Sequence, residues 1–154
     1  MNSLNKTFLP INNYKNRNWF VIDCKNQKLG RLSTLVSTLL KGKIKPHYSP
    51  SVDIGDHVIL INANAIIINN NSQHYIVNHP GRPGHSLKIK NVSQCLPKFT
   101  IEKSVKGMLS KSEKKRLMRR LIICNKENHP HQAQNPIKLD LLNLYSSLPN
   151  VNIS

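Results

Sequence analysis

The sequence predicts one α/β domain whose core strands pair in parallel. Two short β-prone runs, at residues 19–22 and 58–61, flank a stretch over 29–40 whose apolar side chains fall at helical spacing. A strand, a helix and a strand within about 40 residues form the βαβ pattern, in which the strands pair in parallel through a right-handed crossover. The chain has 154 residues, the length of one ordinary domain with an additional tail.

The ends of these elements carry recognisable signals. The run that begins at Trp19 stops at Asp23, and Gly42 follows the expected helix at a place where helices commonly end. A third buried strand is expected at 66–68. The residues that we expect to be mostly buried, where the helix packs on the sheet, are Trp19, Val21, Leu32, Leu35, Val36, Leu39, Val58, Leu60 and Ile61.

The second half of the chain is less regular. Proline and glycine in the stretch 79–84 exclude a helix or a central strand, so we expect a stiff loop there. A helix is expected in the second half of 93–109, and a short strand at Ile122 and Ile123. The expected organisation is an extended basic N-terminal arm (1–17), an α/β domain (18–128) and a peripheral C-terminal tail (129–154).

The charge balance limits the class of partner. There are 23 Lys and Arg against 7 Asp and Glu, which gives a formal net charge of +16. Such a chain attracts polyanions, and the candidates are nucleic acid and an anionic membrane surface. No amphipathic helix pairs a basic face with a rim of Trp and Phe, and the longest apolar run, 58–68, is too short to span a bilayer. We therefore expect RNA or DNA as the partner, and no membrane.

Two clusters of basic residues are the strongest candidates for phosphate contacts. The segment 98–126 holds ten Lys or Arg and only two acids. A solvated helix face is the alternative interpretation, but such faces normally mix charges of both signs. The second cluster is Lys41, Lys43 and Lys45, at and beyond the expected helix end. Interaction with the helix dipole explains the lysines nearest the helix end but not all three. A loop that contacts phosphates explains the whole cluster.

The stiff loop presents a third candidate, Arg82. A guanidinium between two rigid turns suits docking to folded RNA, but any surface turn uses the same residue types, and both interpretations stay open. Cys124 with His129 and His131 is a poor metal set, because structural zinc needs four ligands. We expect no metal.

Nothing in the sequence indicates catalysis. Asp53 and Asp56 are expected to form a turn and a cap before the strand at Val58. No catalytic triad, glycine-rich phosphate loop or Walker lysine is present, so we expect no enzyme, no cofactor and no small-molecule substrate. The three cysteines are an odd number at wide spacing, which argues against a disulfide framework and for a reducing compartment.

Eight motifs between residues 6 and 136 resemble one protein family, in a single order and with nearly its spacing. They are Trp19-Phe20-Val21-Ile22-Asp23, Leu29-Gly30-Arg31-Leu32, Leu40-Lys41-Gly42-Lys43, Tyr48-x-Pro50-x-Val52-Asp53-x-Gly55-Asp56, Ile61-Asn62-Ala63, the loop 79–84, Val105-Lys106-Gly107-Met108-Leu109, and His129-Pro130-His131-x-Ala133-Gln134-x-Pro136. Each motif is weak alone, but eight in register are specific. The chain resembles the family of the thirteenth large-subunit ribosomal protein, of bacterial and organellar type.

The resemblance implies a three-layer α/β domain with a mostly parallel central sheet. It also implies a structural protein that binds large-subunit (23S-type) rRNA, supports early subunit assembly and neighbours large-subunit proteins three and twenty. The wording Arg82-Pro83-Gly84 and the start Asn5-Lys6-Thr7 resemble plastid-encoded members. We therefore expect the plastid (chloroplast) stroma, with the bacterial cytoplasm or the mitochondrion as alternatives. The expected rRNA contacts are Lys41, Lys43, Lys45, Arg82, Lys106, Lys111, Lys114, Lys115, Arg116, Arg119, Arg120, His129 and His131.

The chain departs from the family pattern at four places. They are the stretch 69–72, which lacks the family's usual lysine, then Ser110, the triplet 114–116 and the triplet 124–126. These differences put loop geometry in question, and not the class. The alternative function is a free-standing RNA- or DNA-binding regulator, and a small α/β enzyme is a distant third. A regulator needs a recognition helix or exposed aromatic residues on a sheet, whereas this chain is only 5% aromatic.

Overall fold

Four short strands form a sheet in which every neighbouring pair is parallel. The computed structural model describes residues 9–10, 17–69, 73–77, 79–82, 84, 87–92 and 95–140. The strand order is β5–β2–β1–β6. The strands are β1 (Trp19–Asp23), β2 (His57–Ile61), β5 (Leu121–Ile123) and β6 (Ile137–Leu139). The α/β class and the parallel sheet predicted from the sequence are confirmed.

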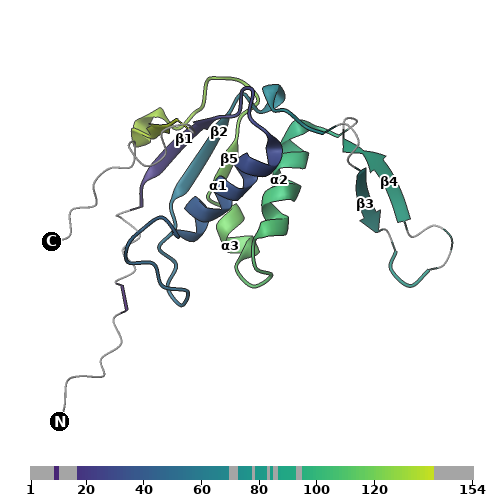
Figure 1. Ribbon diagram of the computed structural model, residues 1–154, viewed down its shortest axis with the longest axis horizontal. Coiled ribbons are helices and arrows are strands. Elements are labelled where there is room, and N and C mark those ends of the chain that lie inside the picture. The colour runs from purple at the N-terminus through teal and green to yellow at the C-terminus, as the bar shows by residue number, and fades with distance from the viewer. Residues whose placement is uncertain are drawn as a thin grey trace, which may run out of the picture.

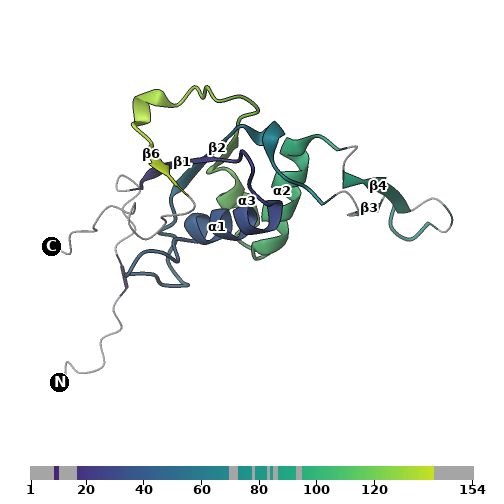
Figure 2. The same ribbon diagram turned by 45° about the horizontal axis from the view of Figure 1, so that its top comes forward.

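Three helices lie on one face of this sheet (Figures 1 and 2). They are α1 (Leu29–Lys41), α2 (Pro97–Met108) and α3 (Lys114–Met118). Helix α1 ends where the sequence predicted, at Gly42, whose φ of 74° is the left-handed conformation that glycine adopts without strain. The amide of Gly42 donates to the carbonyl of Leu39, and the amide of Lys43 donates to the carbonyl of Thr38. These two hydrogen bonds satisfy carbonyls that the helix end would otherwise leave unpaired.

The core lies between the helices and the sheet. Successive strand residues point to opposite faces, so Phe20 and Ile22 of β1 face the helices together with Val58 and Leu60 of β2. The helices contribute further buried side chains, which include Leu32, Val36, Leu39, Ile101, Val105 and Leu117. The core predicted from the sequence is correct for the helix-facing residues. Val21 and Ile61 are buried on the opposite face instead, and Trp19 and Leu35 are only partly buried.

The opposite face of the sheet is covered by the connection from β5 to β6, residues 124–136, which includes the short 3-10 helix η5 (Gln132–Gln134). Figure 2 shows this connection on the side away from the helices. The third layer of the predicted architecture is therefore this connection, with no α-helix among its described residues. On this face the Trp19 ring stacks on His57, with centroids 4.1 Å apart, and lies 5.6 Å from the ring of His131.

The predicted boundary of the domain needs a correction. Residues 129–154 were expected to form a peripheral tail, but β6 pairs with β1 from Phe20↔Ile137 to Ile22↔Leu139. Leu139 is buried in the main core. The α/β domain therefore continues through Leu139. Residues 141–154 of the predicted tail, and most of the predicted arm, lie outside the described residues.

Two further elements differ from the sequence prediction. In place of a strand at 66–68, the chain forms the 3-10 helix η3 (Ala63–Ala65) and then one isolated parallel bridge between Ile67 and Lys28. The strands β3 (Gln73–Val77) and β4 (Leu87–Asn91) form a two-stranded antiparallel sheet that was not predicted. Figure 1 shows this hairpin projecting from the body of the molecule. The predicted stiff loop at 79–84, of which residues 79–82 and 84 are described, falls between these two strands in the sequence.

The packing of α1 predicts that truncating two of its leucines will lower the free energy of unfolding by different amounts. Leu39→Ala should lower the free energy of unfolding by about 2–5 kcal/mol, because Leu39 is buried in the core and its truncation leaves a cavity. Leu35→Ala, one turn earlier on the same helix, should cost less, because Leu35 is only partly buried. Urea unfolding followed by circular dichroism measures both changes. Equal costs would contradict the packing described.

Candidate nucleic-acid interface

A buried carboxylate, Asp53, joins three arginines from different parts of the chain. Its Oδ1 lies 2.8 Å from Nη2 of Arg120, and its Oδ2 lies 3.1 Å from Nε of Arg116 and 3.4 Å from Nη2 of Arg17. The Asp53 side chain is 6% exposed. A carboxylate removed from water needs such partners, because an unpaired buried charge is very costly. Asp53 therefore ties the segment before β1, helix α3 and the approach to β5 to the loop that follows α1.

A second buried carboxylate, Asp56, fixes the other end of the same loop. Its Oδ1 accepts hydrogen bonds from the Lys45 ammonium at 2.6 Å and from the Asn18 amide at 2.9 Å. The Lys45 ammonium also donates to the carbonyl of Ile54 at 2.9 Å. The predicted turn at Asp53 is present as a hydrogen bond from the Gly55 amide to Oδ1 of Asp53. The predicted cap is not: Asp56 instead binds Lys45 and the backbone before β1.

Gly55 lets this loop lie directly against the end of α1. A Cβ at position 55 would stand 1.8 Å from the carbonyl oxygen of Leu40, so only glycine fits. The Arg120 guanidinium fills the space beside it, donating to the carbonyls of Gly55 at 2.9 Å and Leu40 at 3.1 Å. The loop, the end of α1 and the approach to β5 are thereby held at one end of the molecule.

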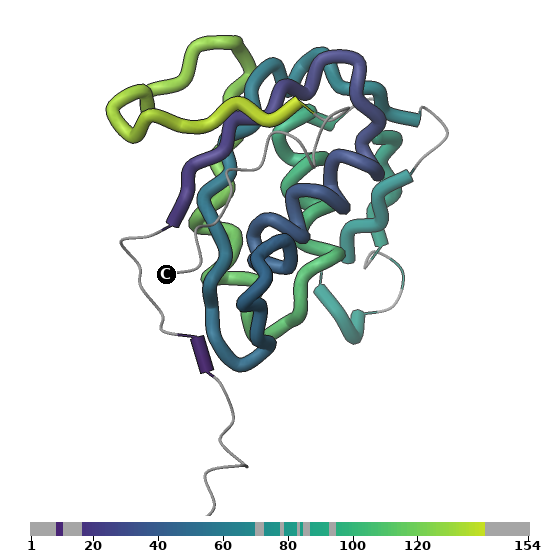
Figure 3. The backbone as a smooth tube through the Cα atoms, turned by 60° about the vertical axis from the view of Figure 1, so that its left-hand side comes forward, coloured from purple at the N-terminus to yellow at the C-terminus, as the bar shows by residue number. Residues whose placement is uncertain are grey.

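The two predicted basic clusters meet at this end. Figure 3 shows the loop after α1 lying beside the segment that contains α3. The Lys41 ammonium donates to the carbonyl of Met108 at 3.1 Å, and Arg116 binds Asp53 across the same junction. We call the resulting surface the basic end, and it consists of Lys41, Lys43, Lys111, Lys114, Lys115, Arg116 and Arg119. Since Asp53 and Asp56 are buried and paired internally, they do not present free carboxylates at this surface.

Arg120 requires a correction, because the sequence placed it among the phosphate contacts. Its side chain is 5% exposed and binds Asp53, Gly55 and Leu40 inside the protein. Burial lowers the pKa of the Arg120 guanidinium, and Asp53 acts against this shift. Arg119, the preceding residue, is exposed. Lys45 is also largely engaged internally, through Asp56 and Ile54.

Four other predicted contacts are not part of the basic end. Arg82 is exposed in the loop of the β3–β4 hairpin, where its amide donates to the carbonyl of His79. Lys106 is exposed on α2 and lies 3.7 Å from Glu102. His129 and His131 belong to the connection that covers the opposite face of the sheet, where Nδ1 of His129 is buried without a hydrogen-bond partner among the described residues. The structure thus brings only part of the predicted set together.

Sequence reasoning missed some of the basic residues. Arg17 was assigned to the arm, yet its guanidinium reaches both the carboxylate and the carbonyl of Asp53. Lys88 and Lys90 stand exposed on β4, which was not predicted at all. A signal for that hairpin does exist in the alternation Leu87-Lys88-Ile89-Lys90 beyond a Pro- and Gly-containing loop.

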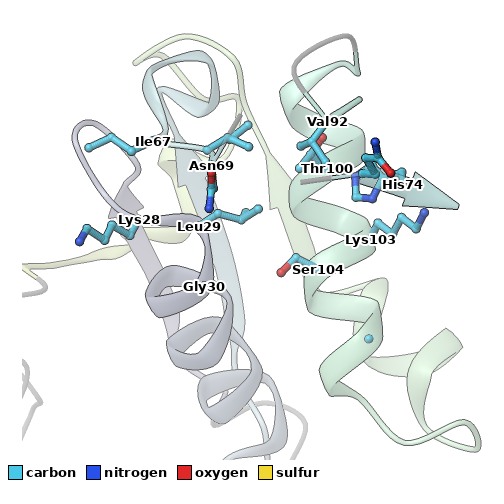
Figure 4. Close-up of a pocket in the computed structure, with 13 residues that line it drawn as sticks. Lys28, Leu29, Gly30, Ile67, Asn69, His74, Val92, Thr100, Lys103 and Ser104 are labelled. Carbon is cyan, nitrogen blue, oxygen red and sulfur yellow. The ribbon is translucent and has the colours of Figure 1, made fainter. Parts of the chain in front are cut away.

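The described residues also enclose a cavity beside the start of α1. It measures about 590 Å³ and lies between the start of α1, residues 67–69 and α2 (Figure 4). Its walls are mostly apolar, and no carboxylate or thiol is among its described lining residues. Elsewhere, burial raises the pKa of the Cys24 thiol to about 12, with Asp23 adding to the rise, so this thiol stays protonated at neutral pH.

The described residues also bear on metal and membrane association. Within the part of the chain that the structure describes, no group of three His, Cys, Asp or Glu side chains is placed to hold a metal ion. None of the described helices has the length and apolar character needed to cross a bilayer.

The fold and the basic end together define a small, strongly basic α/β protein built around a parallel sheet, with an internal ion-pair network. The sequence of the chain matches the model of one known protein family. Residues 17–130 match the model of the family described as ribosomal protein L13. The chain belongs to the ribosomal protein L13 family.

Individual relatives agree with this assignment. The chain is 49% identical over 138 residues to the large ribosomal subunit protein uL13c of Trieres chinensis, covering 89% of this chain and 98% of that protein. It is 43% identical over 139 residues to uL13c of Porphyra purpurea, covering 86% and 96%. It is 42% identical over 144 residues to uL13 of Synechococcus elongatus, covering 90% and 95%. The resemblance found in the sequence is confirmed, and the chain is a structural ribosomal protein, not an enzyme.

Two adjacent arginines should respond very differently to the same substitution. Arg120→Gln should lower the free energy of unfolding by about 3–5 kcal/mol, because it leaves the Asp53 carboxylate buried with fewer partners. Arg119→Gln removes the same charge from an exposed position and should change stability by no more than about 0.5 kcal/mol. Chemical denaturation of the two variants checks this. Similar losses in both would contradict the internal role of Arg120.

The pH dependence of stability should reflect His57. Burial lowers the pKa of His57 below its ordinary value of 6.5, Arg120 and Arg17 lower it further, and Asp56 acts in the opposite direction. The unfolded chain then binds more protons than the folded chain, so stability should fall as pH drops from 6.5 toward the folded pKa. His57→Gln should make this dependence shallower in thermal unfolding measured between about pH 7 and 5. An unchanged slope would show that His57 does not titrate as described.

Proposed function

We propose that this chain binds large-subunit rRNA through its basic end, and that it does so in the large subunit of a plastid ribosome. The observation that carries the proposal is the meeting of two basic clusters, from the end of α1 and from α3, at one end of the fold. The nearby carboxylates Asp53 and Asp56 are buried and paired, so the exposed Lys and Arg side chains keep a surplus of positive charge. Phosphate groups of RNA are the polyanion that a ribosomal protein meets at high density.

The same observation supports phosphate contacts over base recognition. Lys43, Lys111 and Lys115 are exposed lysines on loops and on the short helix α3. Among the described elements, no long helix presents these side chains as a groove-reading element, and folded RNA is recognised largely through its shape and backbone. The proposed role is therefore to position and neutralise rRNA during early assembly, with large-subunit proteins three and twenty as the proposed neighbours.

Plastid location is supported by the relatives. Proteins named uL13c, from Trieres chinensis and Porphyra purpurea, are 49% and 43% identical to this chain, and a cyanobacterial protein named uL13 is 42% identical. Sedimentation tests the location and the function together. After a moderate salt wash, the chain should co-sediment with the large subunit from isolated plastids. Recovery in the free-protein fractions would favour the alternative, a free-standing RNA-binding regulator.

Salt dependence tests the basic end itself. If the seven cations Lys41, Lys43, Lys111, Lys114, Lys115, Arg116 and Arg119 each neutralise one phosphate, the slope of log affinity against log salt should be about −5 to −6. Filter binding of the full chain to its rRNA measures this slope. Lys114→Gln/Lys115→Gln should make it shallower by about 1.4 to 1.8.

A matched pair provides the control for that measurement. Lys25→Gln/Lys138→Gln removes the same charge from exposed positions outside the basic end, and the slope should stay nearly unchanged. If both double variants shift the slope equally, the binding depends on net charge alone and the basic end is not the interface.

A further inference from the structure

One face of the β3–β4 hairpin is apolar and exposed. In the antiparallel register, Tyr75 lies opposite Ile89 and Val77 lies opposite Leu87, so all four side chains point to the same side of the ribbon. Their exposed fractions are 58%, 54%, 62% and 53%. We call these four residues the apolar hairpin face. The reverse side carries His74, Ile76, Lys88 and Lys90.

The apolar side chains of this face are not buried by any other described part of the protein. The hairpin is separate from the main sheet, and a lone two-stranded ribbon has little stability of its own. Two of the contacts that join β3 to the body are known in detail. The Lys103 ammonium donates to the carbonyl of Tyr75 at 3.3 Å, and the His74 and Phe99 rings meet edge-on with their centroids 6.1 Å apart. These contacts leave the apolar hairpin face open to solvent.

A groove extends the face toward α2. It measures about 360 Å³, and its lining includes Tyr75, Val77 and Phe99. Phe99 is itself 44% exposed, which adds an aromatic ring to the exposed apolar surface. Contiguous exposed apolar surface bounded by polar groups is typical of a site for another macromolecule.

The surroundings of the face are basic. Lys103 and Lys106 line the groove, and Lys88 and Lys90 add positive charge on the reverse side of the hairpin. Among the described residues that line the groove, the single carboxylate is Glu102, and it lies 3.7 Å from Lys106. A complementary surface would therefore be apolar at its centre and acidic at its edge. A second copy of this chain does not meet that description, because its formal net charge is +16.

We propose that the apolar hairpin face docks onto another protein of the large subunit, one that presents an apolar patch ringed by carboxylates. The inference rests on the proposed function, because it takes the chain to be seated in the large subunit. RNA is the other material there. Tyr75 and Phe99 are rings on which a base could stack, but Val77, Leu87 and Ile89 offer neither rings nor hydrogen bonds to phosphates, so most of the face suits a protein better than RNA. Burying them against a protein patch removes apolar surface from water without stripping phosphates of their hydration.

A photochemical probe on this face distinguishes the partners. Tyr75→p-benzoylphenylalanine places the probe at an exposed position of the full chain, and large subunits are then isolated and irradiated. The expected adduct joins the chain to a protein of the subunit and resists ribonuclease. Mass spectrometry identifies this protein, which should present an apolar patch rimmed by acids at the cross-linked site. An adduct with rRNA, with a second copy of this chain, or with no macromolecule would overturn the proposal.

Two variants test whether the face itself makes the contact. Leu87→Ser/Ile89→Ser, combined with the probe, should lower the yield of the protein adduct by at least about tenfold, because the apolar area is lost. Lys88→Ser/Lys90→Ser alters the reverse side of the same strand and should lower the yield by less than about threefold, because these side chains point away from the apolar hairpin face. Equal losses would contradict docking through the apolar hairpin face.

The same samples separate this inference from the proposed function. The amount of chain that co-sediments with the large subunit is measured beside the adduct yield. If the chain is absent from the subunit, both proposals fail. If the chain is present but the probe at position 75 reaches only rRNA, docking fails while rRNA binding through the basic end stands.

Discussion

Asp53 is the residue on which the arrangement of the basic end depends. It lies in the loop between α1 and β2, and its carboxylate binds guanidinium groups that come from before β1, from α3 and from the approach to β5. Arg120 extends this network to the carbonyl groups of Leu40 and Gly55, which join the end of α1 to the loop. Buried charges must be paired. These segments, which are far apart in the sequence, are therefore held together by ion pairs as well as by apolar packing.

This internal pairing also shapes the outer surface. The carboxylates of Asp53 and Asp56 are occupied by arginine or lysine from within the protein, so they do not neutralise the exposed lysines of the basic end. A surface with such an excess of one charge works against compactness in the free chain, and a bound polyanion removes that cost. A fixed scaffold with an excess of positive charge on its surface suits a ribosomal protein, although Glu113 pairs with Arg116 at this surface.

The sequence was informative where periodicity and burial coincide. Apolar spacing located β1, α1, β2, α2 and β5, and Gly42 marked the end of α1, because each of these features is decided by local geometry and by one buried face. Prediction from the sequence failed where the structure of a segment depends on residues far away in the chain. β6 is three residues long and exists through its pairing with β1. Residues 66–68 form one bridge, in which the backbone of Ile67 hydrogen-bonds to Gln27 and Leu29 on either side of Lys28. Arg119 and Arg120 are the same residue type at adjacent positions, and only the fold shows that Asp53 lies beside one of them.

The most direct test of the role of Asp53 is the rRNA affinity of the Asp53→Asn variant, measured in the cold, where circular dichroism shows the chain folded. Loss of an acid raises the net charge, so electrostatics alone would strengthen binding to RNA. The ion-pair network around Asp53 predicts the opposite: the three arginines lose their common anchor, the basic end loses its shape, and affinity falls by at least about tenfold, or 1.4 kcal/mol. Unchanged or tighter binding would show that the basic end does not depend on Asp53.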